Sequence, residues 1–229
     1  MKASLRDILL HIYSILYKFY GPQGWWPGDT RLEVIVGAIL TQNTSWKSVE
    51  KAISNLKKAK ILSRPSLIDG LSRKKLAGLI KPSGYYNVKA KRLKNFIRFL
   101  SSSYGSSLNR VARQNTDRLR EEFLNVNGIG PETCDSILLY AFNRPVFVVD
   151  AYTRRVFSRH GLFSGTTGYD EIQKIFMDNL PRDKGLFNEY HALIVRLAKE
   201  ICKTRPGCAA CPLKGYNQFC TQNWLANDI

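Results

Sequence analysis

Two features between residues 124 and 150 have the residue types that chemistry requires. The first is a glycine turn, Asn-Gly-Ile-Gly-Pro at 127–131, and the second is the carboxylate of Asp150, which follows the apolar run 146–149. Glycines lack a Cβ atom and allow positive φ angles with outward-facing backbone N–H groups, which can hold an anion. A fixed carboxylate can act as a general base or stabilise a developing positive charge. The stretch therefore offers a phosphate site and an acid–base group. The alternative is that the glycines only form a turn between two packed helices and that Asp150 only caps the N-terminus of a helix.

The glycine turn is expected to join two helices. Pro131 suits the first position of a helix, where unpaired N–H groups carry the positive end of the helix dipole. Apolar residues recur at three-and-four spacing over 132–142, and the residues before the turn have similar spacing. The predicted unit is helix, hairpin, helix, in which Gly128, Ile129 and Gly130 form the anion-binding turn.

The charge of the chain indicates a polyanionic partner. Its 229 residues include 35 Lys and Arg against 18 Asp and Glu, a net charge of +17. From Ser72 to Arg120 there are thirteen basic residues and one acid, Asp117. A surface that is merely well solvated would normally mix the two signs. No amphipathic anchor or lipidation signal accompanies the charge, which favours nucleic acid over a membrane surface.

Four of the five cysteines lie close together near the C-terminus with the spacing C-x5-C-x2-C-x8-C. They are Cys202, Cys208, Cys211 and Cys220. Disulfides would require an oxidising compartment, and because the sequence has no secretion signal we expect metal binding instead. Four thiolates suit both a zinc ion and a [4Fe-4S] cluster, and the spacing alone leaves both open.

The hydropathy pattern predicts an all-α protein. Helical apolar stripes occur in 46–56, 88–100 and 193–201, whereas no alternating strand pattern of useful length is present. The run 145–149 is interpreted as a short buried connector. Residues 1–20 form an amphipathic helix pattern, and no apolar run reaches the length of a membrane span.

In order along the chain, the hairpin, Asp150 and the cysteines resemble the helix-hairpin-helix DNA glycosylase superfamily, specifically its iron-sulfur branch around endonuclease III and the adenine glycosylase of mismatch repair. The segments 32–44, 84–90 and 148–156 share in the resemblance, which covers most of the chain. The cysteine loop departs from the branch's usual six-two-five pattern by a shorter first gap and a longer last gap.

A narrower similarity concerns three short segments, 24–27, 40–46 and 82–87. They look like the corresponding parts of the 3-methyladenine DNA glycosylase III group of the same superfamily. Members of that group lack the cysteine loop, so this chain resembles a cluster-bearing relative of the group.

The resemblance implies two helical lobes that bind DNA. A six-helix barrel lobe with the hairpin is expected over 31–143, and residues 1–30 plus 144–229 are expected to form the second lobe, with the cysteine loop around a [4Fe-4S] cluster. The implied partner is double-stranded DNA with a damaged or mispaired base. We expect a monomer that does not bind membranes and is cytoplasmic, associated with the nucleoid through DNA.

The implied reaction is excision of a flipped-out base by hydrolysis of its N-glycosidic bond. Asp150 would stabilise the oxocarbenium-like transition state and orient or deprotonate water. Glu132 stands where bifunctional members carry a lysine, and since a carboxylate cannot form an imine, we expect a glycosylase without lyase activity. Gln42 would fill the gap left by the base, and Tyr85 would wedge the opposite strand.

For the base pocket we nominate Trp25, Trp26 and Trp46, because a cationic alkylated purine such as 3-methyladenine stacks on indole with roughly 1–2 kcal/mol. The alternative is that these tryptophans pack in the hydrophobic core and do not contact the base. His191 could hydrogen-bond the base or Asp150, or serve the core. The alternatives are a mismatch, uracil or oxidised-base glycosylase of the same fold, an endonuclease III-like abasic-site lyase, and a non-enzymatic DNA-binding module.

Overall fold

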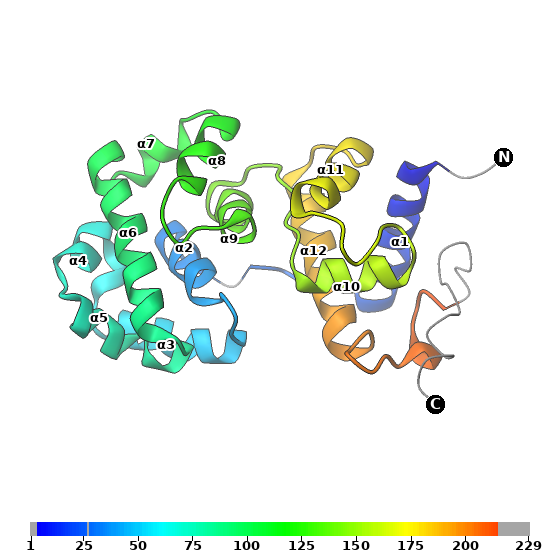
Figure 1. Ribbon diagram of the computed structural model, residues 1–229, viewed down its shortest axis with the longest axis horizontal. Coiled ribbons are helices and arrows are strands. Elements are labelled where there is room, and N and C mark those ends of the chain that lie inside the picture. The colour runs from blue at the N-terminus through cyan, green and yellow to red at the C-terminus, as the bar shows by residue number, and fades with distance from the viewer. Residues whose placement is uncertain (1–3, 27, 215–229) are drawn as a thin grey trace. The chain divides into compact units, whose positions relative to one another are not determined.

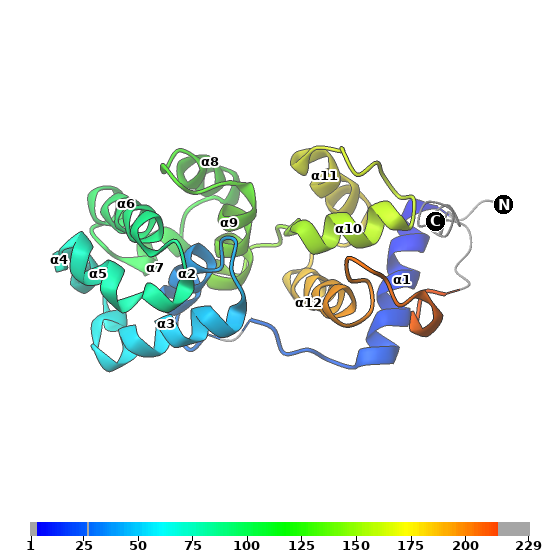
Figure 2. The same cartoon turned by 60° about the horizontal axis from the view of Figure 1, so that its bottom comes forward.

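The structure is a computed structural model that describes residues 4–26 and 28–214. Over these residues it is helical and contains no strand, so the predicted all-α class is confirmed. The chain forms two compact units, one of residues 26–144 and the other of residues 1–25 with 145–229 (Figures 1 and 2). None of the described helices is long and apolar enough to cross a membrane.

The unit formed by the two ends of the chain is built around its longest helix. Its helices are α1 (Leu5–Tyr20), α10 (Ala151–Arg159), α11 (Tyr169–Asn179), α12 (Lys184–Glu200) and the short 3-10 turn η4 (Cys208–Ala210). Both α1 and α10 pack against α12. The buried Tyr190 of α12 donates a hydrogen bond from its hydroxyl to Leu9 O at 2.8 Å, which ties α12 to α1.

The other unit surrounds a helix that is buried on every side. Its elements are α2 (Arg31–Leu40), α3 (Trp46–Lys58), η1 (Ile61–Ser63), α4 (Pro65–Gly70), α5 (Arg73–Leu79), η2 (Lys81–Ser83), α6 (Tyr86–Tyr104), α7 (Leu108–Ala112), α8 (Thr116–Leu124), α9 (Pro131–Ser136) and η3 (Ile137–Ala141). Every residue of α2 from Leu32 to Leu40 is buried. This helix packs against α3, α6, α9 and η3, so it forms the core that positions the loops described below.

The helix predicted over 132–142 is regular only in its first part. It is α-helical to Ser136 and continues as the π-helical segment η3 to Ala141. Asn143 then has a φ of 55°, and the N–H of Arg144 donates to Leu138 O, six residues earlier, at 2.9 Å, which closes the C-terminal end of the segment. The hydropathy pattern does not distinguish the wider π turn from an α turn here, because both bury the same apolar residues.

The buried connector predicted at 145–149 is present. Residues 146–149 lie outside any helix and are at most 5% exposed. The buried Gln173 of α11 donates its side-chain amide to Phe147 O at 2.6 Å, and the ring of Phe147 stacks on Phe176 at a centroid distance of 4.0 Å. The connector leads directly into Asp150 at the start of α10, so its packing fixes where that carboxylate stands.

Candidate functional site

Asp150 caps the N-terminus of α10. Its Oδ1 accepts the backbone N–H of Thr153 at 2.7 Å, and its Oδ2 lies 3.5 Å from Nε2 of His191 on α12. The two side chains are only 12% and 6% exposed. Burial acts to raise the pKa of Asp150, but the interaction with His191 and the backbone hydrogen bond from Thr153 outweigh it, so this pKa is lowered from its ordinary value. The site is therefore an ionised carboxylate held in one position by two helices.

The glycine hairpin lies between α8 and α9 in the other unit. Gly128 has a φ of 98°, and a Cβ atom at this position would lie 2.3 Å from Cγ of Arg92, so both backbone and packing require glycine. Ile129 is buried, and its N–H donates to Val126 O at 3.0 Å. Ile129 thus anchors the hairpin in this structure, rather than offering its own N–H to an anion.

Gly130 differs from Gly128 in both its backbone conformation and its packing. Its φ of −94° is open to any residue, and a Cβ atom there would meet nothing within 4 Å. No hydrogen bond among the described residues uses its N–H. Gly130 caps α9, and Glu132 lies exposed in the first turn of that helix. The carbonyl oxygen of Gly130 accepts the N–H of Cys134 at 2.9 Å, so the hairpin presents the N–H, not the carbonyl, of Gly130 to a ligand.

Gln42 follows α2 and rests on the hairpin. Its Nε2 donates to Gly128 O at 3.1 Å and to Thr133 Oγ1 at 2.9 Å, while its Oε1 accepts from Nη1 of Arg92 at 2.5 Å. The next residue, Asn43, has a φ of 51°. Gln42, Arg92 and the hairpin thus form one hydrogen-bonded group, and the sequence had indicated neither Arg92 nor Thr133 as its members.

Tyr85 is the most exposed large hydrophobic side chain of the described residues, at 73%. It precedes α6 in the left-handed conformation with a φ of 45°, directly after Gly84. A non-glycine residue in this conformation costs of order 1 kcal/mol or more and is enriched at functional sites. The 83–85 turn therefore presents an aromatic ring to solvent at an energetic cost.

Lys89 connects the Tyr85 and Gln42 loops. It is 1% exposed, and its ammonium donates to Leu40 O at 2.8 Å and to Ser83 O at 2.6 Å. Burial, with a contribution from the charge of Arg92, lowers the pKa of Lys89 to about 8. Sequence reasoning missed this residue because it stands within a long basic run that is typical of a surface.

Two of the three nominated tryptophans meet in one aromatic cluster. Trp26 lies edge-on to Trp46 at 5.0 Å between ring centroids and stacks on Tyr140 at 4.9 Å. Gly37 of α2 lies beside both indoles: a Cβ atom at this position would be 3.5 Å from each, an ordinary van der Waals contact. Trp25 belongs to the other unit, where its ring lies 5.9 Å from the ammonium of Lys199. Tyr140 is a further member that the sequence did not indicate.

Three of the four loop cysteines, Cys202, Cys208 and Cys211, lie in the described part of the chain, and none of the three forms a disulfide there. Buried Cys202 follows α12, its carbonyl accepts from Nε of Arg155 at 2.7 Å, and its Sγ lies 3.4 Å from Nη1 of Arg159. The N–H of Cys211 donates to Cys208 O at 3.2 Å across η4. Within 4–26 and 28–214 no three His, Cys, Asp or Glu side chains gather as a metal site, and Cys220 lies outside these residues.

Comparison with known proteins identifies the family. The chain is 50% identical over 222 residues to the "Putative DNA repair glycosylase MJ1434" of Methanocaldococcus jannaschii, which covers 96% of this chain and 99% of that protein. The structure of the present chain resembles that of Helicobacter pylori 3-methyladenine DNA glycosylase (MagIII) bound to 1,N6-ethenoadenine. The TM-score is 0.74 at 32% identity, and the match covers 86% of this chain and 98% of the H. pylori chain.

A trapped covalent intermediate of endonuclease III with DNA has the same fold, with a TM-score of 0.78 at 20% identity and coverage of 93% of this chain and 94% of that one. The family model described as HhH-GPD superfamily base excision DNA repair protein matches residues 36–182, which include the hairpin and Asp150. These matches confirm the resemblance found in the sequence: the chain belongs to the HhH-GPD superfamily of base excision DNA repair proteins.

Proposed function

We propose that this protein is a DNA glycosylase that hydrolyses the N-glycosidic bond of a damaged base and leaves the DNA strand intact. The observation that carries the proposal is the ionised Asp150, mostly buried and fixed by Thr153 and His191 at the start of α10. A structural N-cap needs neither the burial nor the second partner. Membership of a base excision repair superfamily supports the reaction class.

Asp150 acts on the sugar of a flipped-out nucleotide. As the base leaves with the bonding electrons, positive charge develops on the sugar ring, and the fixed carboxylate stabilises it. Water then adds to the anomeric carbon and gives a proton to the carboxylate, which leaves an abasic site. Low exposure strengthens this electrostatic effect, because little water competes with the carboxylate.

The absence of strand cleavage follows from Glu132. This residue lies two positions after Gly130, exposed in the first turn of α9, where a lysine would supply the amine for a Schiff base. A carboxylate cannot attack the sugar in that way. Its charge favours the N-terminal end of α9 instead, which is a structural reason for its presence.

An alkylated purine is the proposed substrate class. The cluster of Trp26, Trp46 and Tyr140 offers electron-rich rings, and an alkylated base such as 3-methyladenine carries the positive charge that such rings attract. The H. pylori protein, 32% identical to this chain, is a 3-methyladenine DNA glycosylase by name, which supports the same class. The alkylated base also has a weakened glycosidic bond.

A panel of duplexes tests the function and the subtype together. Each duplex carries one lesion: 3-methyladenine, 7-methylguanine, uracil, thymine opposite guanine, or 8-oxoguanine. We expect abasic sites to accumulate fastest with the methylated purines, strand breaks to appear only after alkali, and borohydride to trap no covalent adduct. The readout is a denaturing gel of labelled strands before and after alkali.

Each other outcome of the panel contradicts a different part of the proposal. Preference for uracil, mismatched thymine or 8-oxoguanine would reject the alkylated purine alone. A borohydride adduct would assign a lyase and reject the interpretation of Glu132. Binding of every duplex without any abasic product would identify a non-enzymatic DNA-binding module.

Double-stranded DNA is the proposed partner, and Gly130 provides a test of how it is held. A Gly130→Ala substitution fits the folded protein, because its φ is ordinary and the space around the new Cβ is open. It would nevertheless keep a phosphate away from the bare N–H. Since a hydrogen bond to a charged group is worth about 1.5–3 kcal/mol, we expect affinity to fall about tenfold or more, equally for damaged and undamaged duplexes, in a fluorescence anisotropy titration.

Gly128→Ala serves as the contrasting variant in this experiment. The positive φ and the contact with Arg92 predict a loss of stability as well as affinity, visible as a lower melting temperature. If Gly130→Ala bound DNA as tightly as the original protein, the hairpin would only join two helices.

A [4Fe-4S] cluster is the proposed cofactor, with zinc as the alternative. Cys202, Cys208, Cys211 and Cys220 would hold it, since four thiols match the ligands of such a cluster. Glycosidic hydrolysis moves no electrons, so the cluster would stabilise the C-terminal loop.

A further inference from the structure

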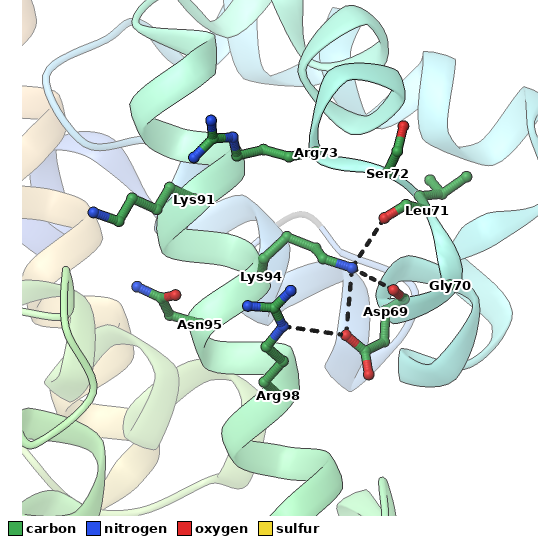
Figure 3. Close-up of a pocket in the computed structure, with 9 residues that line it drawn as sticks. All are labelled: Asp69, Gly70, Leu71, Ser72, Arg73, Lys91, Lys94, Asn95 and Arg98. Atoms are coloured by element: carbon green, nitrogen blue, oxygen red, sulfur yellow. Dashed lines mark hydrogen bonds and ion pairs between the residues drawn. The ribbon is translucent and has the colours of Figure 1, made fainter.

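A basic hollow of about 580 Å³ lies at the junction of α4, α5 and α6, in the unit that carries the hairpin (Figure 3). Four cationic side chains line it: Arg73 from α5, and Lys91, Lys94 and Arg98 from α6. Asp69 is the one carboxylate among the described residues of its lining. The lining therefore has an excess of positive charge, and such a hollow is expected to attract an anion.

Lys94 neutralises the carboxylate and shapes the hollow. The Lys94 side chain is 7% exposed, and its ammonium donates to Leu71 O at 3.0 Å and lies 3.3 Å from Asp69 Oδ1. It also donates to the carbonyl oxygen of Asp69 at the end of α4 (Figure 3). These bonds hold the 69–71 loop in place and compensate the negative charge of Asp69, which leaves the other cations available to a ligand.

Arg73 and Lys91 are those available cations. Both are exposed, and neither has a carboxylate within 4 Å in the described part of the chain. Arg73 extends from the start of α5 toward α6 (Figure 3). Arg98 keeps only a long contact of 3.9 Å with Asp69. A guanidinium and an ammonium facing one hollow form a typical site for a phosphate group.

The hollow adjoins the hairpin through Asn95. This residue lines the hollow, and its Nδ2 donates to the carbonyl oxygen of Asn127, directly before Gly128, at 3.0 Å. Lys91, Asn95 and Arg98 follow one another at four and three residues, so they share one face of α6 over about 10 Å of helix length. A phosphate at the hairpin and one in the hollow would therefore be close enough to belong to one DNA molecule.

The lining favours a phosphate of the nucleic acid backbone over a base or nucleoside. None of the described lining residues is aromatic, so the hollow lacks the stacking surface that recognises bases. We propose that this hollow binds a phosphodiester of the DNA duplex and so forms a second, sequence-independent anchor beside the hairpin. The inference rests on the proposed DNA-binding function and adds a contact region to it.

The salt dependence of DNA affinity tests this anchor. The double variant Arg73→Gln/Lys91→Gln removes the two available cations. Its matched control, Lys74→Gln/Lys75→Gln, removes two exposed charges from α5, the helix of Arg73, and neither of them lines the hollow. Because each phosphate contact contributes about 0.9 to the slope of log K against log salt, we expect this slope to fall by about one in the first variant, with affinity about tenfold lower. The control should keep the slope of the unchanged protein.

Equal slopes in the two double variants would overturn the proposed anchor. The cations of the hollow would then contribute only to the general positive charge of the protein surface. Titration of the unchanged protein with inorganic phosphate, followed by the amide signals of Lys91 and Asn95, supplies a second arm. Saturable phosphate binding with no difference in DNA slope would assign the hollow to a free anion and reject the DNA contact. Failure of the proposed glycosylase reaction is a separate result, seen as missing abasic sites while the slopes still differ.

Discussion

Replacing Asp150 with Asn should lower base excision by at least about a hundredfold, the scale expected when a main electrostatic or general-base group is lost. The Asn side chain can still accept the Thr153 N–H that Asp150 Oδ1 accepts at 2.7 Å, so the cap of α10 remains. The negative charge that stabilises the developing sugar cation is gone. Single-turnover excision on the preferred duplex measures the loss, and the melting temperature should change little.

Asp183→Asn is the matched control for this substitution. Asp183 caps α12 in the same unit and accepts the N–H of Leu186 at 2.6 Å, but it has no part in the proposed reaction. Its variant should excise bases at the original rate. Asp150→Asn should still bind damaged DNA, as tightly or more tightly than before. Excision near the original rate in Asp150→Asn would leave Asp150 as a helix cap alone.

The lowered pKa of Asp150 gives this prediction a pH dependence. A free Asp carboxyl has a pKa of about 3.9, and the folded protein holds this carboxyl below its ordinary range. The carboxylate therefore stays charged as the pH falls from 7 to 5, and its contribution is lost only when the pH drops through the lower folded-state pKa. The ratio of the excision rate of the original protein to that of Asp150→Asn should accordingly be constant between pH 7 and 5.

Local patterns in the sequence predicted the helical fold and the hairpin well. The three-and-four spacing of apolar residues reports which side of a helix is buried, and α3, α6 and α12 follow it. The regular helix expected over 132–142 failed at the π segment after Ser136. A change in helix type leaves the burial pattern nearly the same, so hydropathy carried no signal for it.

Contacts between distant residues were beyond the sequence. Lys89 has the residue type and neighbours of a surface cation, yet it is buried, and two carbonyls from the C-terminal ends of α2 and η2 accept its hydrogen bonds. Tyr140 stacks on Trp26, a partner more than a hundred positions away. Such pairs depend on how helices cross, which a periodicity in one segment does not encode. Trp25 shows the converse, since its neighbour in sequence, Trp26, belongs to a different unit.

Loss of the loop metal is the second large effect that we expect. If the cysteines hold a [4Fe-4S] cluster, the purified protein should be yellow-brown with broad visible absorbance, and chemical analysis should find iron and sulfide. Cys211→Ser removes one thiolate from the proposed ligand set and should abolish the colour and lower solubility. The matched control is Cys134→Ala in α9: that buried thiol lies outside the loop, and burial raises its pKa, so its variant should keep the full colour.

The arginines of α10 explain why this loss would extend beyond the loop. Arg155 and Arg159 hold the Cys202 segment through its carbonyl and its sulfur, and α10 begins at Asp150. Removal of the cluster would release the C-terminal end of the helix that carries the proposed catalytic carboxylate. We therefore expect the soluble fraction of Cys211→Ser to excise bases more slowly than the original protein. A colourless purified protein that contains one zinc ion would reject the iron-sulfur assignment, and the same Cys211→Ser loss of solubility would then be attributed to zinc.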